Sequence, residues 1–247
     1  MTIPLSHYCE RARWALDWCG VEYREEHCLQ GFHLRAVKKA GGKRTAPVLA
    51  GDGWSVGDSA SIVVWADANA APGRTLYPAP HREAIGELER SFEGELGVEA
   101  RRWVYHRMLP HRRLLLRYNA GRAPRHQRAT VALMFPVLRR TLVDYFAITD
   151  ENVDAGLAAV RGHLDRVAAL LADGRRYLTG DRYSAADLTF ASLAALFVMP
   201  PEYGAPMPPI EELPAPLAAE VQAFRAHPGG AFAMRLYAQE RKHSPAS

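Results

Sequence analysis

Residues 45–59 decide the predicted fold; they read Thr-Ala-Pro-Val-Leu-Ala-Gly-Asp-Gly-Trp-Ser-Val-Gly-Asp-Ser. Two short runs of strand-forming residues, Pro47–Ala50 and Trp54–Val56, flank the turn residues Gly51-Asp52-Gly53. Asp-Gly between two such runs is a strong β-hairpin signal. Residues 58–70 then show the apolar spacing of an amphipathic helix. A hairpin followed by a helix is therefore expected here.

The residues before this stretch predict two parallel strands joined by a helix, and the hairpin would continue their sheet. Thr2–Leu5 and Val21–His27 are expected strands, and Cys9–Cys19 is an expected helix because apolar residues recur on one helical face. Gly31–Lys39 is a loop or a short helix. The resulting order is β-α-β-(α)-β-β-α. A parallel βαβ unit followed by an antiparallel hairpin and a helix is the thioredoxin topology.

A Pro- and Gly-rich linker at residues 70–81 separates this region from the rest of the chain. We expect two domains, residues 1–72 and residues 81–247, and the second is read as all-helical. Pro200–Pro216 is expected to be an extended connector within it. The predicted helices are His81–Arg107, Pro110–Tyr118, Pro124–Phe146, Glu151–Ala172, Ala185–Val198, Pro214–Ala226 and Pro228–Lys242.

Composition argues against several classes of function. The net charge is +4 with both signs spread along the chain, so no basic patch indicates nucleic acid binding. No apolar run is long enough to span a bilayer, and the N-terminus does not resemble a secretory signal. The three cysteines, Cys9, Cys19 and Cys28, are odd in number and confined to the first 28 residues. A disulfide framework is not expected, and a reducing cytoplasm fits better.

Four short motifs follow one another along the chain. They are Ser6-His7-Tyr8-Cys9 after the first strand, Thr45–Leu49 before the hairpin, Asp58-Ser59 at a helix start, and Gly180–Asp187 before an apolar helix. Each is weak alone, but the ordered set resembles the cytosolic glutathione S-transferase family over nearly the whole chain. The resemblance implies an α/β thioredoxin-like domain that binds glutathione, followed by an all-α domain that carries the second-substrate site.

The first motif offers two candidate catalytic groups, Ser6 and Cys9. It resembles the C-P-Y-C site of glutaredoxins, with Ser6 in the place of the first cysteine. Ser6 can simply cap the helix, or it can donate a hydrogen bond to a glutathione thiolate held at the positive end of the helix dipole. Cys9 can be a nucleophile with a depressed pKa, or a small buried hydrophobe.

The other two N-terminal motifs imply a glutathione clamp. A cis peptide before Pro47 exposes the backbone of Ala46, which in the family pairs with the cysteinyl main chain of glutathione; a trans proline on an edge strand is the alternative. Asp58 and Ser59 are preferred capping residues, and in the family such a pair also holds the γ-glutamyl end. The glycyl carboxylate needs a cation or donor, for which the candidates are His33, Lys39, Lys43 and Arg44.

The helical region supplies candidates of a different kind. Ser184 and Asp187 read as a capping box, with Tyr183 and Leu188 as a hydrophobic staple, and this motif is interpreted as structural. The second substrate is expected between the domains, where the candidate lining is Trp103, Tyr105, Met108, Leu115 and Tyr118. An acidic substrate would suit Arg101, Arg102, His106 and Arg107, although a solvated helix face is the preferred interpretation of these four.

The leading functional hypothesis is a glutathione transferase in which Ser6 activates the thiolate for attack on a small, apolar electrophile. The first alternative is a glutathione-dependent thiol reductase or deglutathionylase that uses Cys9. The second is a non-catalytic glutathione-transferase-like binding protein. In the two enzymatic hypotheses glutathione is the cosubstrate, and no metal is expected. Family analogy implies a homodimer that serves detoxification. Cysteine usage fits a cytoplasmic protein, and composition predicts neither a nucleic acid nor a membrane partner.

Overall fold

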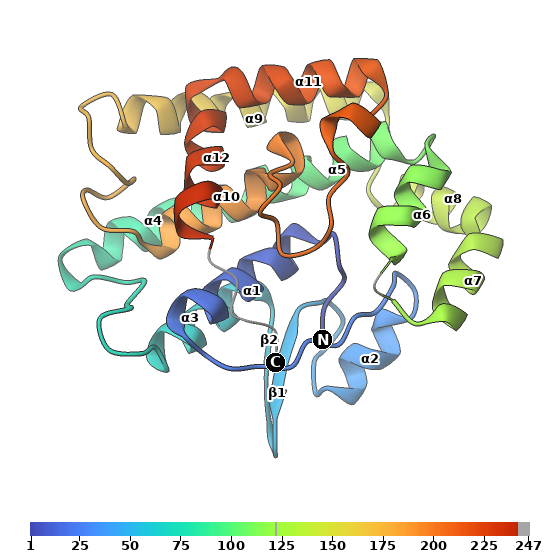
Figure 1. Ribbon diagram of the computed structural model, residues 1–247, viewed down its shortest axis with the longest axis horizontal. Helices are drawn as coiled ribbons and strands as arrows, with labels where there is room; N and C mark the ends of the chain where they lie inside the picture. Colours follow the sequence, from blue (N-terminus) through green and yellow to red (C-terminus); the bar gives the residue numbers. More distant parts are fainter. Residues whose placement is uncertain (122, 242–247) are drawn as a thin grey trace.

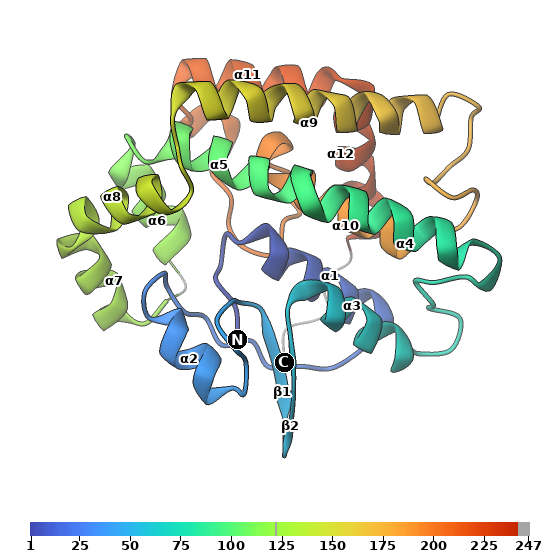
Figure 2. The same cartoon turned by 180° about the vertical axis from the view of Figure 1, so that it is seen from behind.

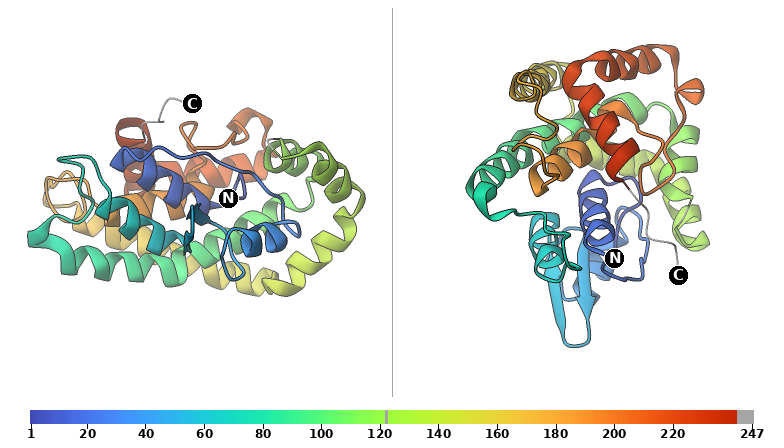
Figure 3. Two further views of the ribbon diagram at one scale, coloured as in Figure 1. Left: turned by 90° about the horizontal axis from the view of Figure 1, so that it is seen from below. Right: turned by 60° about the vertical axis from the view of Figure 1, so that its left-hand side comes forward.

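The structure is a computed structural model that describes residues 1–121 and 123–241. A small region with a β-hairpin packs beneath an all-helical region, and the hairpin projects away from the helices (Figures 1 and 3). This arrangement confirms the predicted fold class. The first region consists of α1 (His7–Cys19), α2 (His33–Lys39), β1 (Val48–Gly51), β2 (Trp54–Gly57) and α3 (Ser59–Ala68).

The helical region begins after a short 3-10 turn at Ala79–His81. Helices α9 and α11 lie on the side farthest from the hairpin (Figure 2). Within the described residues, no helix combines the length and apolar character needed to cross a bilayer. The helices are α4 (Arg82–Ser91), α5 (Gly97–Met108), α6 (Arg112–Ala120), α7 (Arg125–Leu133), α8 (Phe135–Tyr145), α9 (Asp150–Leu170), α10 (Ala185–Val198), α11 (Ala215–Ala226) and α12 (Pro228–Glu240).

Helix α1 has sequence-encoded ends. The Ser6 backbone is extended, and its hydroxyl accepts the N–H of Cys9 at 3.4 Å, which makes Ser6 the N-cap. Gly20 ends the helix with a left-handed backbone, φ 73°, and donates its N–H to the carbonyl of Asp17. Glycine is favoured at this position because it has no Cβ to clash. The predicted helix therefore starts and stops for the expected local reasons.

The prediction of strands at Thr2–Leu5 and Val21–His27 is wrong, because neither segment forms a strand in the structure. The structure joins these segments by a single parallel bridge. The ladder stops there because Pro4, the next residue that would face this segment, has no N–H to donate. The Ile3 N–H points away from the segment and donates to a cysteine sulfur of α1. Both segments are nevertheless extended where they meet.

The N-terminus also pairs with the hairpin. The Met1 ammonium donates to the carbonyl of Val48 at 2.8 Å, and the N–H of Val48 donates to the carbonyl of Met1 at 3.2 Å. Val48 in turn faces Gly57 in the antiparallel β1–β2 pair. The first residues therefore lie between the segment that ends near His27 and the hairpin, which is the order of a thioredoxin-like sheet.

The two longest predicted helices are each interrupted. The helix expected over His81–Arg107 contains a π-helical segment, Phe92–Leu96, between α4 and α5. The helix expected over Pro124–Phe146 breaks between α7 and α8, since Pro136 lies in the first turn of α8 and cannot donate to the preceding turn. The connector after α10 is also not wholly extended, because Ile210–Glu212 forms a 3-10 turn. Segments of π-helix often accompany functional sites.

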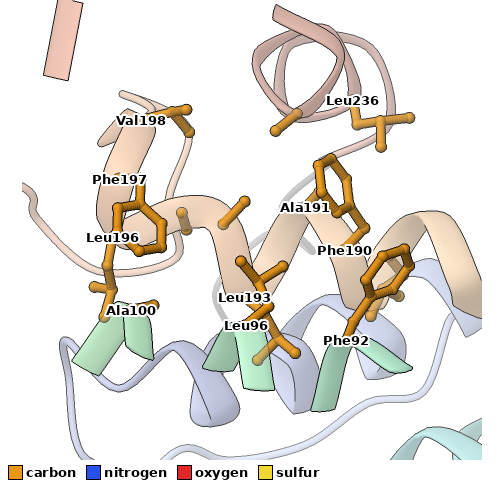
Figure 4. Packing of buried hydrophobic residues seen from close by; sticks show 14 of the residues in the cluster. Phe92, Leu96, Ala100, Phe190, Ala191, Leu193, Leu196, Phe197, Val198 and Leu236 are labelled. Atoms are coloured by element: carbon orange, nitrogen blue, oxygen red, sulfur yellow. The ribbon is translucent and has the colours of Figure 1, made fainter. Parts of the chain in front are cut away.

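Helix α10 forms the centre of the helical core. All of its residues are buried, and it contacts α1, α4, α5, α11 and α12. The predicted capping box is confirmed: both the Ser184 side chain and the Asp187 side chain cap the start of the helix. Figure 4 shows the side chains of α10 packed against the π-helical segment and α5. The labelled residues in this layer are Phe92, Leu96, Ala100, Phe190, Leu193, Leu196 and Phe197.

Candidate functional site

A cavity of about 400 Å³ lies between the N-terminal region and the helices α5, α6 and α8. Its walls come from loops of the first region, from these helices, and from the connector after α10. The surface is mostly apolar, which suits a small-molecule site. The lining residues used below are Ser6, His7, Tyr8, His33, Arg44, Ala46, Arg101, Val104, Tyr105, Met108, Leu115, Leu138, Leu142 and Phe146.

The cavity is closed on one side by contacts between the two regions. Gln30 donates to the hydroxyl of Tyr105 at 3.3 Å and accepts from the amide of Asn119 at 2.9 Å. The N–H of Leu29 donates to the side-chain oxygen of Gln127 at 3.0 Å. Leu29 is fully buried in a small apolar cluster with residues of α6 and α7. Figures 1 and 2 both show α2 beside α6 and α7.

Ser6 lies at the mouth of α1 and lines the cavity. Its hydroxyl oxygen accepts the N–H of Cys9, so the hydroxyl hydrogen is left to donate. The free N–H groups of the first helical turn and the helix dipole both favour an anion here. The capping role and the ligand role predicted for Ser6 are therefore compatible in one geometry.

Cys9 lies beside Ser6 at the helix start, where the two side chains are in contact, but it does not line the cavity. Its side chain is buried, and its sulfur accepts the N–H of Ile3 at 3.3 Å. Burial raises the pKa of the Cys9 thiol above its usual value. A buried thiol with a raised pKa is a poor nucleophile. Cys19 and Cys28 are buried as well.

His7 and Tyr8 form the floor of the cavity beside Ser6. Burial and the charge of Arg101 lower the pKa of His7 to about 3, so the imidazole is neutral at physiological pH. Its Nε2 lies 2.9 Å from the carbonyl oxygen of Gly97, which can only accept, so we assign the hydrogen to Nε2. Burial raises the pKa of Tyr8, so its hydroxyl is protonated.

The Ala46–Pro47 peptide is cis, as the motif predicts. Ala46 lines the cavity, while the Pro47 side chain is buried behind it. The pairing of Val48 with Gly57 places the proline loop and the start of α3 at the same end of the hairpin. Because Met1 also pairs with Val48, the chain reaches Ser6 at that end too. Three of the four motifs therefore converge.

Asp58 and Ser59 start α3 at this end of the hairpin, outside the cavity wall itself. The Asp58 carboxylate accepts the N–H of Ser61 at 2.8 Å and the Ser61 hydroxyl at 3.1 Å. Asp58 has a positive φ of 56°, a strained conformation for any residue with a side chain. Such strain is concentrated at ligand-contacting positions. Ser59 is buried and Asp58 is exposed.

The candidate cations divide into two groups. His33 and Arg44 line the cavity, whereas Lys39 and Lys43 do not. His33 accepts the N–H of Gly31 through Nδ1 at 3.1 Å, and burial lowers the pKa of His33. Arg44 is exposed at the rim and carries a permanent charge.

The structure also sorts the candidates for the second substrate. Tyr105, Met108 and Leu115 line the cavity. Trp103 does not, since it is 1% exposed and its Nε1–H donates to Glu220 at 2.9 Å. Trp103 is a core residue. Tyr118 lies outside the cavity as well, where its hydroxyl donates to Glu212 at 2.9 Å.

The spacing of residues along α5 distinguishes those that line the cavity from those that do not. The α5 residues in the cavity are Arg101, Val104, Tyr105 and Met108, which follow the i, i+3, i+4, i+7 pattern of one helix face. Trp103 is two positions from both Arg101 and Tyr105 and so points elsewhere. The lining from α8 and from the connector after α10 has no comparable local signal. Within residues 1–121 and 123–241, no group of three or more His, Cys, Asp or Glu side chains could hold a metal ion.

Comparison with known proteins places this fold and site in a family. The model of the glutathione S-transferase N-terminal domain matches residues 1–74, and that of the C-terminal domain matches residues 150–219. No curated protein sequence matches the chain.

Solved structures show the same architecture at low identity. The glutathione transferase GSTFuA3 from Phanerochaete chrysosporium is 17% identical with a TM-score of 0.65, covering 98% of this chain and 92% of that one. A transferase of Ceriporiopsis subvermispora, solved in complex with glutathione, is 17% identical with a TM-score of 0.62, covering 98% and 93%. A glutathione S-transferase from Rhodospirillum rubrum F11 is 22% identical with a TM-score of 0.54, covering 96% of each chain. From the two domain matches and this shared fold, we conclude that the chain belongs to the glutathione S-transferase family.

Proposed function

We propose that this protein is a glutathione transferase that joins glutathione, through its sulfur, to a small electrophile. The observation that carries the proposal is the convergence of the Ser6 helix start, the cis Ala46–Pro47 peptide and the Asp58-Ser59 pair at one end of the hairpin. Ala46 would pair with the cysteinyl main chain, and Asp58 and Ser59 would bind the γ-glutamyl end. Arg44 and His33, which line the cavity, would bind the glycyl carboxylate. The apolar cavity beyond them would receive the electrophile.

Ser6 has the geometry to stabilise a thiolate. An ordinary thiol has a pKa of about 8.5, so lowering it to about 6.5 requires roughly 2.7 kcal/mol of preferential binding of the anion. The end of a helix supplies ~0.3–2 kcal/mol. A hydrogen bond from the Ser6 hydroxyl to the charged sulfur supplies ~1.5–3 kcal/mol. The two contributions together are of the required size. The helix end alone is too small, and the hydrogen bond alone reaches it only at the upper limit of its range.

The alternative that uses Cys9 has less support. The sulfur is buried and does not line the cavity, and burial raises the pKa of the Cys9 thiol. A mixed disulfide with glutathione would need that sulfur to reach the cavity. The non-catalytic alternative is disfavoured because the Asp58-Ser59 pair and the cis peptide, which a scaffold has no need of, are both present.

Calorimetric titration with glutathione and conjugation of 1-chloro-2,4-dinitrobenzene test the proposal together. Ser6→Ala should lower kcat/KM by about 10- to 100-fold, as expected for loss of a hydrogen bond to an anion. Ser6→Thr keeps both the hydroxyl and the cap and should retain most activity. Cys9→Ala should change kcat/KM by less than about threefold.

Two results would reject this assignment. Absence of glutathione binding would remove the transferase function altogether. Loss of activity in Cys9→Ala with Ser6→Ala unaffected would favour the reductase instead.

We further propose domain limits of 1–72 and 81–247, a homodimer in the cytoplasm, and a role in detoxification, on family analogy.

A further inference from the structure

Arg101 carries a positive charge inside the cavity. It lies on α5, and its guanidinium carbon is 4.2 Å from the centre of the Phe146 ring and 5.8 Å from that of Tyr8. Its Nε is buried and has no hydrogen-bond partner. In the part of the chain that the structure describes, no ion pair involves Arg101 and no Asp or Glu lines the cavity. The charge is therefore not balanced by any described carboxylate.

The neighbouring arginines of α5 form hydrogen bonds and ion pairs with the protein. The Nε of Arg102 donates to the carbonyl of Phe146 at 3.0 Å, and its guanidinium also pairs with Glu99. Arg107 pairs with a glutamate of α11 at 3.0 Å. These two arginines connect α5 to its surroundings, whereas Arg101 faces the cavity.

The geometry of Arg101 suits an anionic ligand. Arg101 as a whole is half-buried, and a partly buried charge without an ion-pair partner is still costly. Contact with an aromatic ring offsets only part of that cost. A guanidinium is planar and carries its N–H donors at its edge, where they match the two oxygens of a carboxylate. The neighbouring wall is apolar and would hold the body of such a ligand; it includes Val104, Met108, Leu138 and Leu142.

We propose that Arg101 binds a carboxylate on the second substrate, so that the preferred electrophile is an apolar molecule bearing an acid group. The inference rests on the proposed transferase function, in which the groups assigned to the two glutathione carboxylates belong to the N-terminal region. The thiolate sulfur forms a bond to the electrophilic carbon, the bond to the leaving group breaks, and the leaving group departs with the electron pair. The thiol proton passes to solvent. Arg101 positions the acid group and takes no part in the bond changes.

A matched pair of electrophiles tests the proposal: 4-chloro-3,5-dinitrobenzoate and its neutral amide, 4-chloro-3,5-dinitrobenzamide. Arg101→Gln should lower kcat/KM for the benzoate by about 10- to 100-fold and leave the amide within about threefold, because only the benzoate loses a charge-assisted hydrogen bond. Arg101→Lys should restore part of the preference. Arg113→Gln is the control, since Arg113 is exposed on α6 and its loss changes the net charge equally.

A second arm omits glutathione. Calorimetric titration with 3,5-dinitrobenzoate and 3,5-dinitrobenzamide, which have no leaving group, should show tighter binding of the benzoate in the wild type and no preference in Arg101→Gln. If this preference is present but glutathione neither binds nor reacts, the acid subsite stands and the transferase proposal fails. Equal affinity of the wild type for the two probes would overturn the subsite. An equal loss of rate for both electrophiles in Arg101→Gln would also overturn it and assign Arg101 to the thiolate.

Discussion

Asp187 joins two parts of the helical core. Its Oδ1 accepts the N–H of Leu178 at 2.8 Å, and its Oδ2 accepts the N–H and the hydroxyl of Ser184 at 3.0 and 2.7 Å. All three residues are buried. The carboxylate therefore caps α10 and also fixes the loop that precedes it. We predict that Asp187→Ala destabilises the fold and leaves glutathione affinity unchanged in the folded fraction.

The size of the destabilisation by Asp187→Ala follows from the two backbone N–H groups, of Leu178 and Ser184, that lose their acceptor. Each unsatisfied buried donor costs about 1–3 kcal/mol, which gives ~2–6 kcal/mol for the pair. Burial raises the pKa of Asp187 to about 6, so the ionised carboxylate is itself penalised in the folded state. Alanine removes that penalty, and we expect a net loss near the lower limit, about 2 kcal/mol at pH 8.

The raised pKa of Asp187 also makes the destabilisation by Asp187→Ala depend on pH. The pKa of Asp187 is about 6 in the folded state, above the unfolded value of 3.8, so the folded state binds more protons between these values. The stability that Asp187 contributes therefore falls as the pH rises through this window. The penalty of Asp187→Ala should be larger at pH 5 than at pH 8 by about 1.4 kcal/mol, the value of one pH unit.

Urea unfolding at pH 5 and pH 8 measures both quantities. Asp181→Ala is the matched control, because Asp181 is exposed three residues before the cap and its removal deletes the same charge. The control should stay within about 0.5 kcal/mol of wild type. A penalty for Asp187→Ala no larger than that of the control would refute the structural role. So would a clear loss of glutathione affinity at full stability.

Three further predictions concern α1 and its surroundings. Cys9 should not react with an aromatic disulfide reagent in the native protein at pH 7, and should react once guanidinium unfolds the chain; rapid native reaction would contradict its burial. Gly97→Ala should lower the free energy of unfolding by ~1–3 kcal/mol, since the added Cβ would lie 2.5 Å from the Tyr8 hydroxyl; unchanged urea stability would show that Tyr8 can move freely. Arg241→Ala should cost ~3–5 kcal/mol in the same assay, because Arg241 pairs at 2.7 Å with the fully buried Glu10; a loss below ~1 kcal/mol would disprove this role.

The features that the sequence predicts well are set by a few adjacent residues. The caps at Ser6 and Gly20 and the capping box at Ser184 each depend on groups within four positions of one another in the chain. The hairpin depends on its Asp-Gly turn. The cis peptide before Pro47 is different, since its prediction depends on the order of the motifs along the chain and not on adjacent residues; the structure contains it.

The features that the sequence does not determine depend on residues far apart in the chain. The Thr2–Leu5 segment has strand-like composition, but the Ile3 N–H goes to the Cys9 sulfur and Pro4 has no N–H, so the ladder is not extended. Trp103 is a large aromatic residue on α5, the helix that lines the cavity. It nevertheless packs in the core, where it donates a hydrogen bond to Glu220 and contacts the ring of Phe197. Aromatic composition identifies α5 as a wall of the site but does not identify which face of α5 is the wall.

Arg101 shows why the choice of face matters for function. Its spacing from Val104, Tyr105 and Met108 puts it on the cavity face, where an apolar side chain would cost less than an unpaired guanidinium. The contact with Phe146 fixes the guanidinium but supplies no acceptor for its donors. A charge held in position without a partner is what an anion-binding group requires before its ligand arrives. The same four positions filled with apolar residues would make a more stable helix face, and one unable to distinguish an acid from its amide.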